Sequence, residues 1–97
     1  MATYLVLGHF TEQGMHKVKD TTKRAEAVRE IARKCGATVK DLYWTLGQYD
    51  VALVLEAPDE TSATAFGLSV GVLGNVRTQT LRAFTPEEMT RLLGRMA

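Results

Sequence analysis

The chain opens with a dense run of β-branched, aromatic and aliphatic residues, and three more runs of the same kind follow. Such runs, bounded by polar and glycine-containing segments, are typical of β-strands. The four predicted strands are Thr3–Phe10, Thr38–Leu46, Val51–Ala57 and Val76–Phe84. Only Gly47-Gln48-Tyr49-Asp50 separates the second strand from the third, and so short a connection predicts a β-hairpin.

Elsewhere apolar residues recur at three- and four-residue steps, the spacing of one face of a helix. The first stripe follows the capping segment Asp20–Lys23, ends before Gly36 and consists of Ala25, Val28, Ile31, Ala32 and Cys35. The second follows Pro58-Asp59 and consists of Ala63, Phe66, Val70 and Leu73. The third follows Thr85-Pro86, a strong helix start, and consists of Met89, Leu92, Leu93 and Met96.

The predicted order of elements is β-α-β-β-α-β-α. Its first six elements match the ferredoxin-like βαββαβ plan, an α+β fold in which two helices cover one face of a four-stranded antiparallel sheet. The seventh element is an extra C-terminal helix. At 97 residues the chain is long enough for one hydrophobic core and not for two, so residues 1–97 are predicted to form a single domain.

The strands carry apolar or aromatic residues on both faces. In the first strand Leu5 and Leu7 alternate with Tyr4 and Val6, and Trp44 in the second strand follows Tyr43. A sheet that faces water on one side should be polar on that side, and exposed apolar patches usually mark interfaces. We therefore expect a homo-oligomer, a dimer or larger, that pairs through the sheet. The alternative is that the C-terminal helix folds back over the sheet of its own chain.

Composition narrows the class of partner. Hydrophobic residues make up 45% of the chain and charged residues 24%, which is ordinary for a globular protein. The net charge is only +1, so no basic surface for binding phosphate groups is expected. Nucleic acid and membrane are therefore not expected partners. A single cysteine, Cys35, argues against an intrachain disulfide and a multi-cysteine zinc site, and nothing predicts a cofactor. Without an apolar signal core or a run of membrane-spanning length, the chain is expected in the cytoplasm.

Three parts of the sequence together resemble the GYD domain family. They are Tyr43–Asp50 with its Gly-Gln-Tyr-Asp turn, Gly74–Phe84, and the region of Lys19-Asp20 and Lys23-Arg24-Ala25. The resemblance extends over essentially the whole chain. It implies a ferredoxin-like fold similar to that of dimeric α+β barrel proteins, in which two sheets pair face to face. It leaves the biochemical role open.

Two polar residues of the hairpin turn, Tyr49 and Asp50, are candidate ligand-binding residues. A phenol can donate a hydrogen bond at the mouth of a pocket, and a carboxylate there can act as a base or hold a cation. In the structural interpretation Gly47 lets the backbone reverse and Asp50 caps exposed amides. Both interpretations stay open at this point.

The two histidines, His9 and His16, lie close together in the sequence. His9 ends the first predicted strand and is a further candidate for ligand contact, whereas His16 lies on the short segment that follows. A metal ion bound by both would need a carboxylate such as Glu12 or Asp50. Because no recognised ligand spacing is present, the sequence predicts no metal site.

The fourth predicted strand is poorer in apolar residues than the other three. One of its faces carries Val76, Thr78, Thr80, Arg82 and Phe84, and the other carries Arg77, Gln79, Leu81 and Ala83. If the second set packs on the helices, Thr78, Thr80 and Arg82 point into the open face and become candidate ligand-binding residues, with Arg82 suited to an anion. The alternative for Arg82 is an edge position, paired with Asp50 or Glu56 or simply hydrated.

The favoured functional hypothesis is a non-catalytic oligomer that binds a small organic ligand or serves as an assembly module. The alternative is a small dimeric α+β-barrel enzyme that acts on a hydrophobic organic substrate in an intersubunit cleft. Its candidate residues are His9, Tyr49, Asp50 and Arg82. The enzyme hypothesis requires at least two of these four side chains to converge on one closed pocket.

Overall fold

The computed structural model describes residues 1–97, and its elements follow the predicted order with one additional short helix, α1, after the first strand. The strands are β1 (Ala2–Phe10), β2 (Thr38–Trp44), β3 (Val51–Ala57) and β4 (Val76–Ala83). The helices are α1 (Glu12–His16), α2 (Thr21–Lys34), α3 (Glu60–Gly71) and α4 (Pro86–Leu93), and Val18–Asp20 forms a 3-10 turn before α2. The α+β, ferredoxin-like prediction is confirmed. β2 is shorter than predicted because the chain leaves the sheet after Trp44 and does not continue to Leu46.

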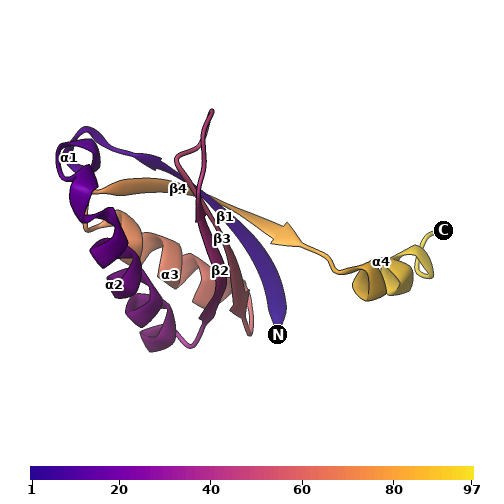
Figure 1. Ribbon diagram of the computed structural model, residues 1–97. Coiled ribbons are helices and arrows are strands. Elements are labelled where there is room, and N and C mark those ends of the chain that lie inside the picture. Colours follow the sequence, from indigo (N-terminus) through magenta and orange to yellow (C-terminus); the bar gives the residue numbers. More distant parts are fainter.

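The strands form one antiparallel sheet in the order β2-β3-β1-β4. Val6 shows the interior place of β1, since it pairs with Leu53 of β3 on one side and with Thr80 of β4 on the other. Figure 1 shows α2 and α3 side by side against one face of the sheet. The sheet is open, so a barrel stays a prediction for a pair of chains.

The helix ends have local causes. The Asp59 side chain accepts a hydrogen bond from the Ser62 amide (2.9 Å) and so caps the start of α3. Gly36 follows Cys35, the C-cap residue of α2, and has φ +80°, a left-handed conformation that glycine adopts without the penalty that a Cβ would bring. No helix in the structure is long and apolar enough to cross a membrane.

The core lies between the sheet and the helices α2 and α3. Its 11 buried residues are Tyr4, Val6, Ala32, Ala37, Val39, Leu53, Leu55, Ala57, Ala63, Phe66 and Val70. Phe66 and Leu55 are the largest fully buried side chains. Burying a side chain of this size contributes about 1.5–3 kcal/mol each relative to exposure, so this layer supplies most of the stability.

One core side chain carries a polar atom without a partner. Tyr4 is 2% exposed, and its hydroxyl has no hydrogen-bond partner. Burial raises the pKa of this phenol, and the Glu60 carboxylate raises it further, because both disfavour the negatively charged phenolate.

We expect Tyr4→Phe to leave the free energy of unfolding unchanged or to raise it by up to about 1 kcal/mol, because it removes a buried unpaired hydroxyl. The pKa of Tyr4 is raised in the folded state, so the stability linked to its proton is present below about pH 10 and is lost as the pH rises above that value. The advantage of the variant should therefore grow in alkali. Urea unfolding at neutral and alkaline pH, with the exposed Tyr43→Phe as control, measures this. A variant less stable than the wild type by over about 1 kcal/mol would contradict the assignment.

Candidate functional site

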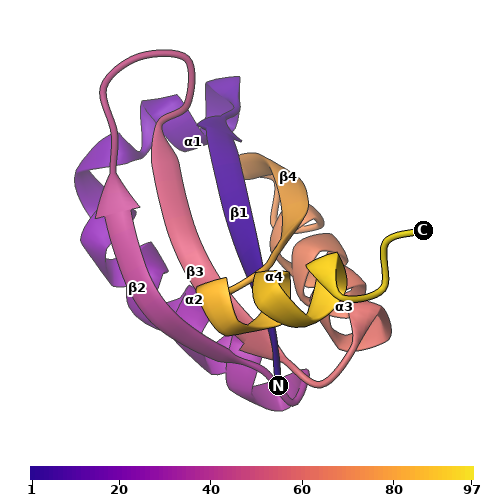
Figure 2. The ribbon, with the colours of Figure 1, turned by 90° about the vertical axis from the view of Figure 1, so that its right-hand side faces the viewer.

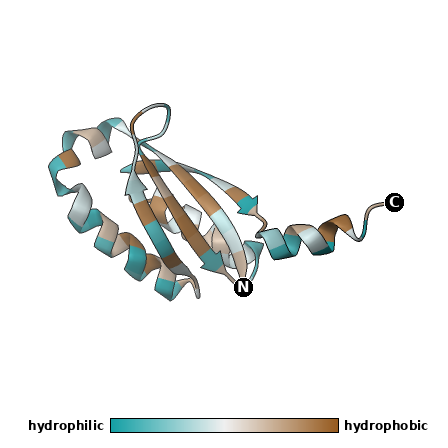
Figure 3. Cartoon of the chain, turned by 45° about the vertical axis from the view of Figure 1, so that its right-hand side comes forward, coloured by the Kyte–Doolittle hydropathy of each residue, from teal (hydrophilic) through white to brown (hydrophobic).

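The face of the sheet opposite α2 and α3 is uncovered and has an apolar centre. Two cross-strand rows occupy it: Asp41, Val54, Leu5 and Leu81, then Tyr43, Ala52, Leu7 and Gln79. Leu5 is 40% exposed, Leu81 39% and Tyr43 59%. Figure 3 shows hydrophobic segments along the strands and in α4. We call these two rows the open face.

Helix α4 does not cover the open face. It lies on that side of the sheet but projects away from the end of β4, as the two perpendicular views in Figures 1 and 2 show. Its apolar residues Met89, Leu92 and Leu93 are exposed, as is Met96 just beyond its end, and we call these four the stripe of α4. The alternative in which the C-terminal helix folds back over its own sheet is therefore wrong.

The direction of α4 is set at its first turn. Thr85 and Glu88 form a capping box, in which the Thr85 hydroxyl accepts from the Glu88 amide (3.1 Å) and the Glu88 carboxylate accepts from the Thr85 amide (3.0 Å). Arg82 on β4 forms an ion pair with Glu88 (3.2 Å). The Thr85 amide, and secondly Arg82, hold the pKa of Glu88 below its ordinary value, because both stabilise the carboxylate.

The loop between β2 and β3 brings three predicted site residues together at one end of the sheet. The rings of His9 and Tyr49 lie 4.7 Å apart between centroids, and the Tyr49 hydroxyl donates to Gln79 Oε1 on β4 (2.7 Å). Asp50 Oδ2 accepts from the Phe10 amide (2.8 Å), and the Asp50 amide donates to the Gly8 carbonyl (2.8 Å). Asp50 thus connects the hairpin to the end of β1, and its carboxylate caps a backbone amide as the structural interpretation predicted.

The other three candidates lie elsewhere. The register aligns Thr78, Thr80 and Arg82 with Gly8, Val6 and Tyr4, whose side of β1 faces the helices. The expectation that they point into the open face is therefore wrong. The two threonines lie against Gly67 of α3, where a Cβ would sit 3.6 Å from Thr78 Oγ1. Arg82 lies at the far end of β4, over the rings of Phe84 (4.6 Å) and Tyr4 (5.6 Å).

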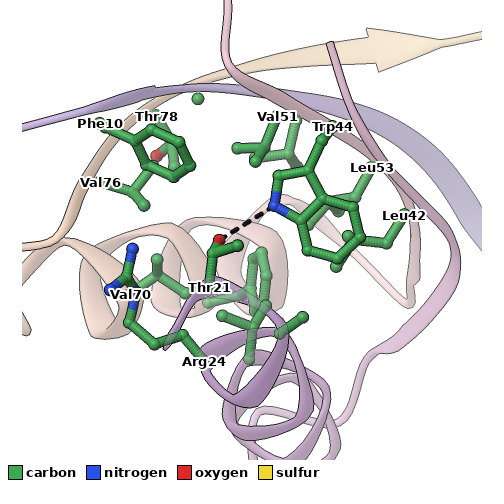
Figure 4. A pocket seen from close by; sticks show the side chains of 15 residues that line it. Phe10, Thr21, Arg24, Leu42, Trp44, Val51, Leu53, Val70, Val76 and Thr78 are labelled. Atoms are coloured by element: carbon green, nitrogen blue, oxygen red, sulfur yellow. Dashed lines mark hydrogen bonds between the residues drawn. The ribbon is translucent and has the colours of Figure 1, made fainter. Parts of the chain in front are cut away.

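An apolar cavity of about 60 Å³ opens between the sheet and the first turns of α2. Its walls include Val28, Leu42, Leu53, Phe66, Val70 and Val76. Trp44 lies at its rim, where the indole Nε1 donates to Thr21 Oγ1 (2.9 Å), and Arg24 reaches toward Phe10 and Val76 (Figure 4). Thr78, which was predicted to bind a ligand on the open face, also lines this cavity on the opposite side of the sheet.

Two signals in the sequence could have located this cavity. Arg24 stands four residues before Val28, on the apolar stripe of α2 and not on its polar face. Gly8 interrupts a strand, which often marks a close approach of other groups. A Cβ at Gly8 would lie 2.7 Å from Val51 Cγ2 and 2.7 Å from Val76 Cγ1, so this position admits no side chain without movement of its neighbours.

Neither location is arranged as a metal centre, because no three His, Cys, Asp or Glu side chains gather anywhere in the chain. The Cys35 thiol lies 4.0 Å from the Ser69 hydroxyl, between α2 and α3.

The enzyme hypothesis has four candidate residues, and three of them, His9, Tyr49 and Asp50, lie together at one end of the sheet. Arg82 is outside that group.

The fold defines a ferredoxin-like α+β domain with one uncovered sheet face. A model of the GYD domain matches residues 4–93, and the chain belongs to that family. The chain is 34% identical over 84 residues to the glutamine synthetase and cystathionine beta-lyase binding protein of Thermus thermophilus, covering 86% of this chain and 88% of that one.

Two solved structures are similar. The crystal structure of TTHA0845 from Thermus thermophilus has a TM-score of 0.55 at 25% identity, covering 88% of this chain and 95% of that chain. A homoserine dehydrogenase from Thiobacillus denitrificans has a TM-score of 0.56 at 17% identity. The match covers 84% of this chain but only 17% of the dehydrogenase, and it shows a shared fold alone.

We expect Asp50→Ala to lower the free energy of unfolding by about 1 kcal/mol, because the partly buried Phe10 amide loses its acceptor. Asp50→Asn, which keeps a carbonyl oxygen at that position, should lose less. Urea unfolding together with amide exchange at Phe10 measures both effects, and Glu26→Ala, at an exposed acid on α2 away from the open face, is the control. Equal Phe10 exchange in the Asp50→Ala variant and the wild type would contradict the structural role.

Proposed function

We propose that this chain is an assembly module that pairs with a second copy of itself through the open face, with α4 of each chain packing at the edge of its partner. The observation that carries the proposal is that the open face and the stripe of α4 are both apolar, both uncovered and on the same side of the molecule. One two-fold rotation can cover both surfaces at once, because such an interface uses the same patch on each subunit.

The size of the face supports a contribution from α4. A seven-residue strand is about 23 Å long and four strands span about 19 Å, so the face has a planar footprint of roughly 440 Å². A stable interface buries about 800 Å² per partner. The exposed stripe of α4 supplies further apolar surface on the same side of the molecule. The ion pair between Arg82 and Glu88 favours an α4 already oriented for this contact.

We infer further that the assembled chain binds a metabolic enzyme. The support is the relative in Thermus thermophilus, whose name states that it binds glutamine synthetase and cystathionine beta-lyase. The enzyme hypothesis receives less support. The Asp50 carboxylate already accepts from a backbone amide and the Tyr49 hydroxyl already donates to Gln79, and neither residue lines the apolar cavity.

Light scattering after size exclusion tests self-assembly. We expect a dimer or larger oligomer for the wild type at micromolar concentration and a dissociation constant at least about tenfold higher for Leu5→Glu, because the change places a charge in the centre of the desolvated contact. The matched control is Leu68→Glu on α3, a leucine that is 66% exposed but lies on the helix-covered side. A monomeric wild type, or equal effects of the two variants, would refute pairing through the open face.

Binding to enzymes is tested separately with purified glutamine synthetase and cystathionine beta-lyase from the organism that encodes this chain. With the enzymes immobilised, we expect saturable binding of the wild-type chain to at least one of them in interferometry. Serum albumin on the same surface is the control for non-specific adsorption. If neither enzyme binds the chain at micromolar concentration, the enzyme-binding part is rejected, whatever the oligomeric state.

A further inference from the structure

The cavity on the helix side of the sheet has the composition of a site for a small amphipathic molecule. Its walls are almost entirely aliphatic or aromatic, and the polar groups around it come from Thr21, Arg24 and Thr78. Water in such a space finds few hydrogen-bond partners, and its displacement by an apolar group is favourable. The space is also larger than the roughly 10–15 Å³ that one water needs on this measure.

Arg24 supplies the second part of the argument. Its guanidinium carries five N–H donors, of which one bonds to the Lys17 carbonyl (2.6 Å) and one to the Gly14 carbonyl (3.1 Å), so three donors have no protein partner. No carboxylate forms an ion pair with Arg24, whereas Arg33 and Arg82 each have one. The guanidinium carbon lies 5.8 Å from the centre of the Phe10 ring, and the two backbone contacts hold it beside the cavity. It is a partly buried positive charge without a counter-ion.

We propose that this cavity binds a small carboxylate with a short apolar body, and that the carboxylate contacts Arg24 while the body enters the space between α2 and the sheet. A planar guanidinium fits a carboxylate through two parallel hydrogen bonds. At about 60 Å³ the cavity is far below the roughly 300–1,000 Å³ of sites for drug-sized ligands and cofactors. An alkyl chain of a few carbons or the edge of one ring fits it, and a fused ring system does not.

The rim provides the reporter. Trp44 is the single tryptophan of the chain, and its indole closes the cavity through the hydrogen bond to Thr21. A molecule that enters beside it changes the polarity around the indole or breaks that hydrogen bond. Either event alters the tryptophan emission of the full chain, so no label is needed.

The probes are hexanoate and its neutral analogue hexanamide, with acetate at equal ionic strength as the control for salt. We expect a saturable change of Trp44 emission with hexanoate, at least about tenfold weaker binding of hexanamide, and no saturable change with acetate, because a charged acceptor bonds a guanidinium more strongly than a neutral amide carbonyl does. Arg24→Gln should abolish the preference for hexanoate over hexanamide. Arg29→Gln should not, since Arg29 is on the same helix and donates to the Val39 carbonyl (2.8 Å) outside the cavity.

A filling variant separates a binding site from a packing void. Ala25 lines the cavity, and Ala27 is exposed on the same helix. We expect Ala25→Leu to abolish hexanoate binding in a chain that still unfolds cooperatively, and Ala27→Leu to leave binding unchanged. No saturable response in the wild type, or hexanoate binding that survives both Arg24→Gln and Ala25→Leu, would overturn the proposal. Because the site lies opposite the open face, these results are independent of the oligomeric state.

Discussion

β1 hydrogen-bonds to a neighbouring strand along both of its edges, so the alternation of its side chains decides what each face of the sheet carries. Tyr4 and Val6 point to the helices and enter the core, while Leu5 and Leu7 point to the open face. A shift of the register of β1 by one residue would exchange the two sets. It would bury Thr3 and His9, the polar residues that share a face of β1 with Leu5 and Leu7. The core and the uncovered apolar face are therefore two consequences of one alternating strand.

The last three residues of β1 join these two faces to the loop that follows β2. Gly8 leaves room for Val51 and Val76 to meet on the helix side, and its carbonyl accepts from the Asp50 amide. His9 packs on Tyr49 at the open side, and the amide of Phe10 donates to Asp50. The Gly-Gln-Tyr-Asp turn is thus held by β1 through backbone groups and one ring contact. Tyr49 and Asp50 therefore have a structural role at this end of the sheet, whether or not a ligand binds there.

Local sequence patterns predicted the main elements, the hairpin, the caps of α3 and α4 and the family, because each depends on residues near one another in the chain. The predicted cap of α2 is absent, since Asp20 makes no side-chain hydrogen bond there. The proximity of His9, Tyr49 and Asp50 was not among these predictions, because it depends on how the hairpin meets the end of β1. The faces of β4 were assigned wrongly because Thr78 and Thr80 look polar in the sequence yet pack against Gly67 of α3, a contact set by tertiary approach. The place of Arg24 depends on carbonyl groups of Gly14 and Lys17, whose position no local pattern encodes.

The two proposed sites lie on opposite faces of the sheet, and adjacent residues of one strand serve both: Tyr43 lies on the open face between Leu42 and Trp44, which line the cavity, and the segment from Trp44 to Asp50 follows. Trp44 closes the cavity on the helix side, and Tyr49 lies beside His9 at the end of the open face. The segment is internally braced, since the Thr45 amide donates to the Asp50 carbonyl (2.8 Å) and the Thr45 hydroxyl donates to the Tyr49 carbonyl (2.5 Å). These bonds fix the two ends of the loop to each other as well as to β1. A ligand in the cavity and a partner on the open face would therefore contact different side chains of the same strands.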